Sequence, residues 1–282
     1  MASQGEAITI NGDEVYAYGI SGAGIGGGGT DDGNNNGYDG ADVIITDGMV
    51  LAVSQTGAGI GGGNDGNGGT VTINGGYVAA TGGYLNYNYW KIGLSKFAPS
   101  AANALNSAYV VDYFLASLIF SGKYGGAGIG GGDDGNGGSV TINGGTVIAT
   151  AGKSSARSIG AGDGGGSSGS IVLYDNAQVT YGHLDSEGDV VEEATAYGPD
   201  ASTFCKGKQF SAIMPGPCNV IFDVGGHGTA PQPQTVQAGE TVKKPADPAA
   251  EGYYFAGWFT DESRQIPYDF RTPVNTLTLY GK

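Results

Sequence analysis

The chain has 282 residues, including 57 glycines and 10 prolines, and its formal net charge is −15 from 12 basic and 27 acidic residues. A protein that binds nucleic acid needs basic side chains to neutralise phosphates, so this composition excludes nucleic acid as a partner and disfavours anionic membranes. No apolar run approaches the roughly 20 residues that span a bilayer, so we expect no transmembrane segment. Glycine that recurs in register indicates a repeat protein rather than disorder.

A glycine-rich motif recurs through the first part of the chain. Its clearest copies read GAGIGGGNDGNGGTVTINGGYVAATGG from Gly57 and GAGIGGGDDGNGGSVTINGGTVIATAG from Gly126. Looser copies begin at Gly22 and Ser158, and AITINGDEVYAYG from Ala7 matches the second half of the motif. In the full copies a Gly-Ile-Gly step, which is Ser158-Ile159-Gly160 in the last one, precedes two segments in which apolar and polar residues alternate, which predicts three short strands per copy.

Two architectures fit this motif. The Asn-Gly-Gly break before the last strand either closes a β-hairpin or forms the corner of one rung in a parallel β-solenoid. We favour the solenoid because a lone hairpin cannot bury its apolar face, whereas stacked rungs align matching residues into interior ladders. The prediction for residues 1–182 is an all-β, right-handed parallel β-solenoid of about four rungs. The expected ladders are Ile25, Ile60, Ile129 and Ile159, and Ile10, Ile45, Ile73, Ile142 and Leu173.

Acidic residues follow the Gly-Ile-Gly step. Stacked rungs would bring these carboxylates to one edge at steps of roughly 5 Å, where like charges repel each other. Calcium would relieve that repulsion, since it binds carboxylate and carbonyl oxygens, although no cofactor is expected to be required. The alternative is that Asp and Asn form the turns by hydrogen bonding to their own backbone. The candidate calcium ligands are Asp32, Asp65, Asp133, Asp134 and Asp163.

An insertion at 83–125 interrupts the repeats. The segment from Pro99 to Gly122 predicts a helix, because its apolar residues recur at helical spacing. Aromatic residues precede this helix, and aromatic side chains displayed on a rigid scaffold are suited to stacking on the sugar rings of a glycan. The alternative is that they pack the helix against the solenoid. The candidate glycan-binding residues are Tyr84, Tyr87, Tyr89 and Trp90.

We expect no catalytic activity from the repeats. The acids of one copy are not set apart from those of the others, and no basic residue recurs beside them in the motif. The glycine strings also lack the Gly-Lys-Ser/Thr and the βαβ context of a phosphate-binding loop. A calcium-dependent polysaccharide lyase or hydrolase is kept as an alternative, because solenoids with clustered acids occur in such enzymes.

The composition changes after the repeats. The segment 183–217 is acidic and unpatterned, which predicts a linker or an irregular cap. Cys205 and Cys218 are the only cysteines. In an extracellular protein we expect them to form a disulfide, which would stabilise the fold by roughly 3 kcal/mol through loop entropy. The alternative is two separate buried thiols.

Residues 218–282 predict a small β domain with four short strands, in which Tyr253 and Trp258 are expected to pack in the core. The pattern includes Val220-x-Phe222, Gly225-Gly226, Val236-x-x-Gly239-x-x-Val242, Gly252-Tyr253-x-Phe255-x-Gly257-Trp258-Phe259, Tyr268-Asp269-Phe270 and Leu277-x-Leu279-Tyr280. This stretch resembles the Listeria–Bacteroides repeat, also called the internalin B-type repeat. The resemblance implies a β-grasp-like fold without catalytic residues, used as a spacer or adhesion module on bacterial surface proteins.

The function we expect is therefore that of a non-enzymatic adhesion or binding protein on the surface of a Gram-positive bacterium. The glycine-rich repeats are also loosely similar to secreted β-solenoid and carbohydrate-binding proteins of gut Firmicutes. The expected location is extracellular, with signal and anchor segments outside this sequence. The expected partner is a host or dietary glycan or a surface protein, and the alternative to binding is a passive surface stalk.

Overall fold

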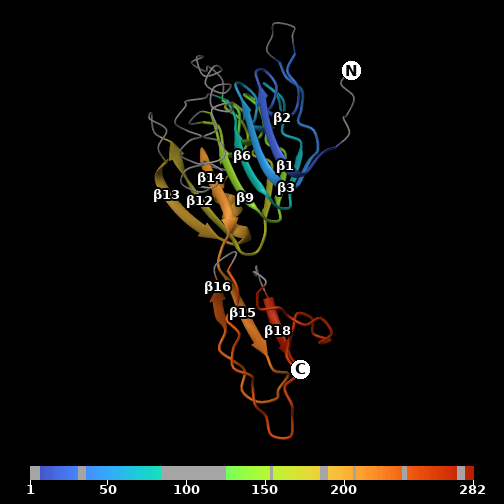
Figure 1. The fold of residues 1–282 in the computed structure, drawn as a ribbon. Helices are drawn as coiled ribbons and strands as arrows, with labels where there is room; N and C mark the ends of the chain where they lie inside the picture. Colours follow the sequence, from blue (N-terminus) through green and yellow to red (C-terminus); the bar gives the residue numbers. More distant parts are fainter. Residues whose placement is uncertain are drawn as a thin grey trace, which may run out of the picture. The chain divides into compact units, whose positions relative to one another are not determined.

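The computed structural model describes residues 7–30, 36–83, 125–152, 155–184, 190–205, 208–236, 240–271 and 277–282 (Figure 1). The chain divides into two compact units, Met1–Met214 and Pro215–Lys282. Apart from one short 3₁₀ helix and one short α-helix, the described elements are strands, so the all-β prediction is confirmed. Within the described part of the chain, no helix is long and apolar enough to cross a membrane.

Successive copies of the motif supply most strands of the first unit. These strands are β1 (Ile8–Gly19), β2 (Ile25–Gly26), β3 (Val43–Ser54), β4 (Ile60–Gly61), β5 (Thr70–Ile73), β6 (Tyr77–Thr81), β7 (Ile129–Gly130), β8 (Ser139–Ile142), β9 (Thr146–Thr150), β10 (Ile159–Gly160), β11 (Ser170–Leu173) and β12 (Ala177–Leu184). The remaining elements are β13 (Val190–Tyr197), η1 (Pro199–Ala201), α4 (Ser202–Cys205) and β14 (Phe210–Pro215).

Equivalent strands of successive copies pair in parallel and in register. The Gly-Ile-Gly steps form a four-stranded sheet in the order β10-β7-β4-β2, which aligns Ile25, Ile60, Ile129 and Ile159. The larger sheet aligns Ile10, Ile45, Ile73, Ile142 and Leu173. Both predicted ladders are confirmed. The right-handed solenoid shape and the number of rungs stay predictions.

The Asn-Gly-Gly break does not close a hairpin. The long strand β3 pairs through its first residues with β5 and through its last residues with β6. In the next copy, β8 pairs with β5 and β9 pairs with β6. Because β5 and β6 pair with neighbouring copies and not with each other, the hairpin alternative is wrong.

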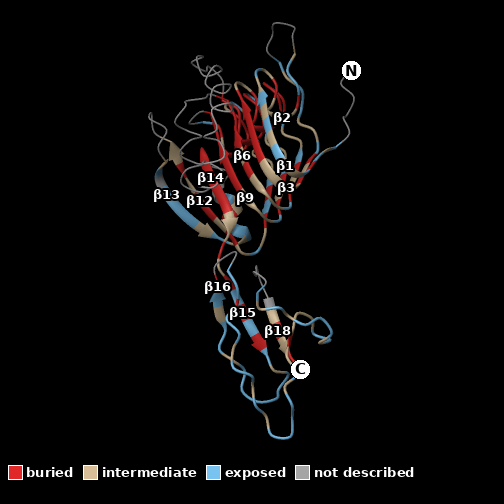
Figure 2. Cartoon of the chain, in the orientation of Figure 1, coloured by how far each residue is buried: buried red, intermediate tan, exposed pale blue. Residues whose placement is uncertain are grey.

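Side chains that alternate inward from these ladders form one apolar core. Figure 2 shows that buried residues dominate the central strands of the first unit, such as β6, β9 and β14. In β5, for example, Val71 and Ile73 are buried, whereas Thr70 is exposed. Glycine is required where rungs approach closely: Gly61 and Gly130 have φ values of 136° and 139°. A Cβ atom on Gly61 would collide with the carbonyl oxygen of Gly130. The abundance of glycine therefore follows from the stacking of the rungs.

The segment 183–217, predicted as a linker or irregular cap, belongs largely to the first unit as strands. Strand β14 pairs antiparallel with β9 and lies between β9 and β12, and β13 pairs antiparallel with β12 at the edge of the sheet. Phe210 and Ala212 of β14 are buried. Among the described residues, Glu193 lies exposed on the edge strand β13, where a charged side chain discourages further pairing.

The second unit is a four-stranded sheet in the order β16-β15-β18-β17. Its strands are β15 (Cys218–Asp223), β16 (Gln234–Val236), β17 (Trp258–Phe259) and β18 (Leu277–Gly281). Strands β15 and β18 are parallel, and both outer pairs are antiparallel. Trp258 packs edge-on against Phe222 in a small core, with ring centroids 5.0 Å apart.

One strand of the second unit is shorter than the sequence predicts. The expected strand from Tyr253 to Phe259 is reduced to the two residues of β17. Gly252 and Gly257, with φ values of 80° and 141°, interrupt the extended run on either side of Tyr253. The described residues of this unit include no helix, so the β-grasp-like fold stays a prediction.

Candidate functional site

The acidic turns of the repeats stack on one another. Asp65 and Asp134 occupy the same position in successive copies and have left-handed backbones, with φ values of 60° and 59°. The Asp65 amide donates to the carbonyl oxygen of Asp133 over 2.8 Å, and the Asp134 amide donates to that of Asp163 over 2.6 Å. Asp readily adopts this conformation, so these residues have the geometry that turn formation requires.

The side chains of these turns differ in their surroundings. Asp133 is only 8% exposed, and its Oδ1 accepts a hydrogen bond from the Gly125 amide over 2.7 Å. Asp163 accepts a hydrogen bond from the Ser155 hydroxyl through its Oδ1. Partial burial and, secondarily, the charge of Asp134 raise the pKa of Asp65. The expected repulsion between stacked carboxylates is therefore present between Asp65 and Asp134.

Calcium binding by these acids stays a prediction. Among the described residues, no group of three or more His, Cys, Asp or Glu side chains is placed to hold a metal ion. Asp32 lies outside the described residues. The left-handed backbones of Asp65 and Asp134 are typical of turns, whereas Asp133 and Asp163 accept hydrogen bonds from residues outside their own turns.

The insertion leaves and re-enters the first unit at one point. Gly83 and Gly125 flank it, and a Cβ atom on Gly83 would lie 2.9 Å from the Gly125 Cα. The Gly83 amide donates to the carbonyl oxygen of Gly57 over 3.0 Å. The copies before and after the insertion still pair in register, for example Ile60 with Ile129, so the insertion does not disturb the ladders. The candidate glycan-binding residues Tyr84, Tyr87, Tyr89 and Trp90 and the predicted helix lie outside the described residues.

The predicted disulfide also stays a prediction. Cys218 is buried in the core of the second unit, and this burial raises the pKa of its thiol. The side chain of Cys205 lies outside the described residues.

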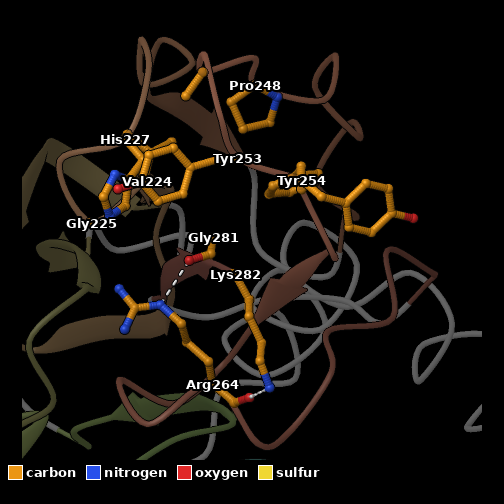
Figure 3. Close-up of a pocket in the computed structure, with 11 residues that line it drawn as sticks. Val224, Gly225, His227, Pro248, Tyr253, Tyr254, Arg264, Gly281 and Lys282 are labelled. Carbon is orange, nitrogen blue, oxygen red and sulfur yellow. Dashed lines mark hydrogen bonds between the residues drawn. The ribbon is translucent and has the colours of Figure 1, made fainter.

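The second unit contains a cavity of about 330 Å³ that the sequence analysis did not anticipate (Figure 3). Tyr253 and Tyr254 line it and are 63% and 89% exposed. The prediction that Tyr253 packs in the core is therefore wrong. Trp258, only 3% exposed, is a core residue as expected. The Tyr253 ring lies against His227, with centroids 4.0 Å apart and planes inclined by 32°.

Two cationic side chains, Arg264 and Lys282, also line the cavity. The Arg264 Nε donates to the carbonyl oxygen of Gly281 over 2.7 Å, and one Nη donates to that of Glu262 over 3.2 Å. The Lys282 ammonium lies 3.4 Å from the carbonyl oxygen of Arg264 (Figure 3). Among the described residues that line the cavity, none is Asp or Glu.

The turn that carries Arg264 is held by its own hydrogen bonds. Arg264 has a left-handed backbone with φ of 55°, and its amide donates to the carbonyl oxygen of Asp261 over 2.9 Å. The Asp261 carboxylate accepts hydrogen bonds from the Ser263 hydroxyl and from the amides of Gln265 and Ile266. These bonds lower the pKa of Asp261 to about 2. The carboxylate therefore fixes the turn that presents Arg264.

The sequence gives little sign of this cavity. A glycine followed by two tyrosines matches an ordinary strand pattern, and the burial of each aromatic residue depends on tertiary contacts. The one local sign is the pair Gly225-Gly226, whose φ values of 62° and 84° form a turn at the cavity wall.

Comparisons with known proteins match two parts of the chain. Residues 219–282 match the Listeria-Bacteroides repeat domain, and residues 8–29, 43–64 and 140–167 match the Beta helix repeat. The resemblance stated from the sequence is therefore confirmed. Internalin H of Listeria monocytogenes is 38% identical over 65 residues, which are 22% of this chain and 11% of Internalin H. The match thus covers a small part of that protein.

Proposed function

We propose that this chain is a non-enzymatic, extracellular adhesion or binding protein of a bacterial surface. The observation that carries the proposal is the Listeria-Bacteroides repeat domain at 219–282, together with the local similarity to Internalin H. Repeats of this family imply a spacer or adhesion module. The Beta helix repeats support the proposal because a stack of paired rungs is a rigid scaffold that can display a binding segment.

The proposed ligand of the first unit is a host or dietary glycan bound by the insertion. Gly83 and Gly125 are buried and bring the two ends of the insertion together, close to the paired strands β6 and β9. Such anchoring limits the freedom of the inserted segment at its base, and a binding segment on a rigid scaffold loses less entropy when it meets its ligand. The aromatic residues proposed to stack on sugar rings are Tyr84, Tyr87, Tyr89 and Trp90.

A passive spacer is the second candidate, and one observation favours it. The described acidic side chains Asp133 and Asp163 accept hydrogen bonds from the protein itself. Repeats whose acidic side chains are engaged by neighbouring segments of the same unit are suited to act purely as a scaffold.

A glycan and mucin array probed with the intact chain, in calcium and in EDTA, tests the proposal. We expect binding that is lost in a Tyr87/Tyr89/Trp90 triple alanine variant and retained in a Tyr197→Ala control, since Tyr197 is an exposed tyrosine on β13. Binding to the array that survives the triple substitution would contradict the insertion as the site. Absence of binding to the array and to epithelial cells would contradict adhesion and favour the spacer.

A further inference from the structure

We propose that the cavity of the second unit binds a sugar that carries a carboxylate, such as a hexuronate residue of an acidic glycan. The site goes beyond the proposed function, because it lies in a different unit from the insertion and involves none of the insertion's residues. Its walls combine aromatic side chains with a fixed guanidinium group (Figure 3).

The size of the cavity favours a small ligand. Ligand pockets in proteins usually measure about 300–1,000 Å³, and this cavity of about 330 Å³ lies at the lower end of that range. A volume of this kind holds one or two sugar rings more readily than a folded peptide segment. The lining is mixed, with Pro248 and Phe255 beside the polar and charged side chains.

The aromatic wall suits the face of a sugar ring. Tyr253 is held by its contact with His227, which fixes the orientation of its ring at the cavity wall. Tyr254 also lines the cavity, but it is 89% exposed and its ring points away from Tyr253 (Figure 3), so Tyr253 supplies the aromatic face. A tyrosine presents an apolar face and a polar hydroxyl, which together match the C–H face and the hydroxyl groups of a pyranose.

The cationic wall suits a carboxylate. The bond from the Arg264 Nε to Gly281 orients the guanidinium, whose fork geometry matches a carboxylate. A Cβ atom on Gly225 would lie 2.7 Å from one Nη of Arg264, so glycine leaves room for the guanidinium at the cavity wall. Lys282 adds a second positive charge to the cavity. The cavity is therefore lined by cationic side chains although the whole chain has a net charge of −15.

The backbone at Arg264 also points to a functional position. Its φ of 55° lies in the left-handed region, which non-glycine residues rarely adopt. Such strain gathers at ligand-binding and active sites, where the surrounding structure holds it in place. Here the hydrogen bonds of Asp261 hold the turn.

Isothermal titration of the intact chain with trigalacturonate, its neutral methyl ester and inorganic phosphate tests the inference. We expect trigalacturonate to bind, the ester to bind at least tenfold more weakly, and phosphate not to bind. Tyr253→Ala and Arg264→Gln should each weaken trigalacturonate binding at least tenfold. Arg271→Gln is the matched control, because Arg271 is exposed, pairs with Asp269 over 2.7 Å and does not line the cavity.

Three results would overturn the inference. Equal affinity for the ester would show that no carboxylate is recognised, and equal affinity for phosphate would show a simple anion site. Failure of all three probes to bind would show that the cavity is not a sugar site. Tyr253→Ala keeps the test valid if Arg264→Gln fails to fold, since Tyr253 is 63% exposed. Array binding that depends on Tyr87, Tyr89 and Trp90 is measured separately, so failure here leaves the proposed function standing.

Discussion

The residues that stand out in the sequence of the repeats have structural roles, whereas the residues that line the cavity of the second unit do not stand out in the sequence. In the repeats, glycine and aspartate recur in every clear copy, and the structure assigns them to close approach and to turns. In the second unit, Trp258 belongs to the core, whereas Tyr254 and Arg264 line a cavity. In this chain, the residues that recur in the repeats therefore maintain the fold, and exposed residues that do not recur form the candidate binding site.

The largest expected effect on stability comes from the core residue Trp258, in contrast to the cavity residue Tyr254. Trp258→Ala should destabilise the second unit by about 3–5 kcal/mol, because it removes a buried side chain that contacts Phe222 and Phe255. Tyr254→Ala should change stability by less than about 0.5 kcal/mol, because Tyr254 is exposed. Urea unfolding measures the free energy of unfolding of both variants. Similar decreases in the two variants would contradict the assignment of Trp258 to the core and of Tyr254 to the cavity.

A substitution at a rung contact tests why the repeats need glycine. Gly130→Ala should destabilise the first unit by about 2–4 kcal/mol, because its φ is 139° and a Cβ atom would meet the carbonyl oxygen of Gly160. Gly28→Ala is the control, since its nearest neighbour would be the Tyr38 ring at 3.8 Å. Thermal unfolding of the two variants compares them, and a neutral Gly130→Ala would contradict close stacking.

Removal of a buried turn carboxylate should have a smaller effect. Asp133→Ala should cost about 1–3 kcal/mol, because it leaves the buried Gly125 amide without its acceptor. The exposed Asp42 offers a matched control, and Asp42→Ala should stay within about 0.5 kcal/mol of the wild type. If denaturant unfolding gave the same decrease in unfolding free energy for both variants, the hydrogen bond to Asp133 would not stabilise the fold.

The smallest expected effect concerns the stacked carboxylates. Asp134→Asn keeps a residue that tolerates the left-handed backbone and should stabilise the chain by a few tenths of a kcal/mol at pH 7, about the size of a surface charge effect. The folded state raises the pKa of Asp65, so this repulsion destabilises at high pH and disappears as Asp65 is protonated on acidification. Melting temperatures at pH 7 and pH 3 should show the gain only at pH 7.

The same variant tests calcium. If the acidic turns bind calcium, the ion should raise the melting temperature of the wild type, and Asp134→Asn should reduce that increase. If the acids only form turns, calcium and EDTA should give the same melting temperature for both proteins.

The strand pairing of the repeats could be predicted from the sequence, because the alignment of the copies fixes which residues lie opposite one another. Once the copies are aligned, the matching of Ile60 with Ile129 predicts parallel pairing, and the structure shows it. The position of β14 between β9 and β12 was not predictable, because antiparallel pairing between distant segments leaves no periodic signal. The cavity was missed for a related reason: Tyr253 and Trp258 fit one strand pattern, and only tertiary contacts separate their burial.

The most direct test of this account is an NMR titration of the intact chain with trigalacturonate, followed through backbone amides and the Arg264 Nε proton. The account predicts shifts at Arg264, Tyr253 and Tyr254 and unchanged signals from the turns of Asp65 and Asp134. Shifts confined to those acidic turns, with Arg264 unchanged, would contradict the assignment of the repeats to scaffold and of the second-unit cavity to binding.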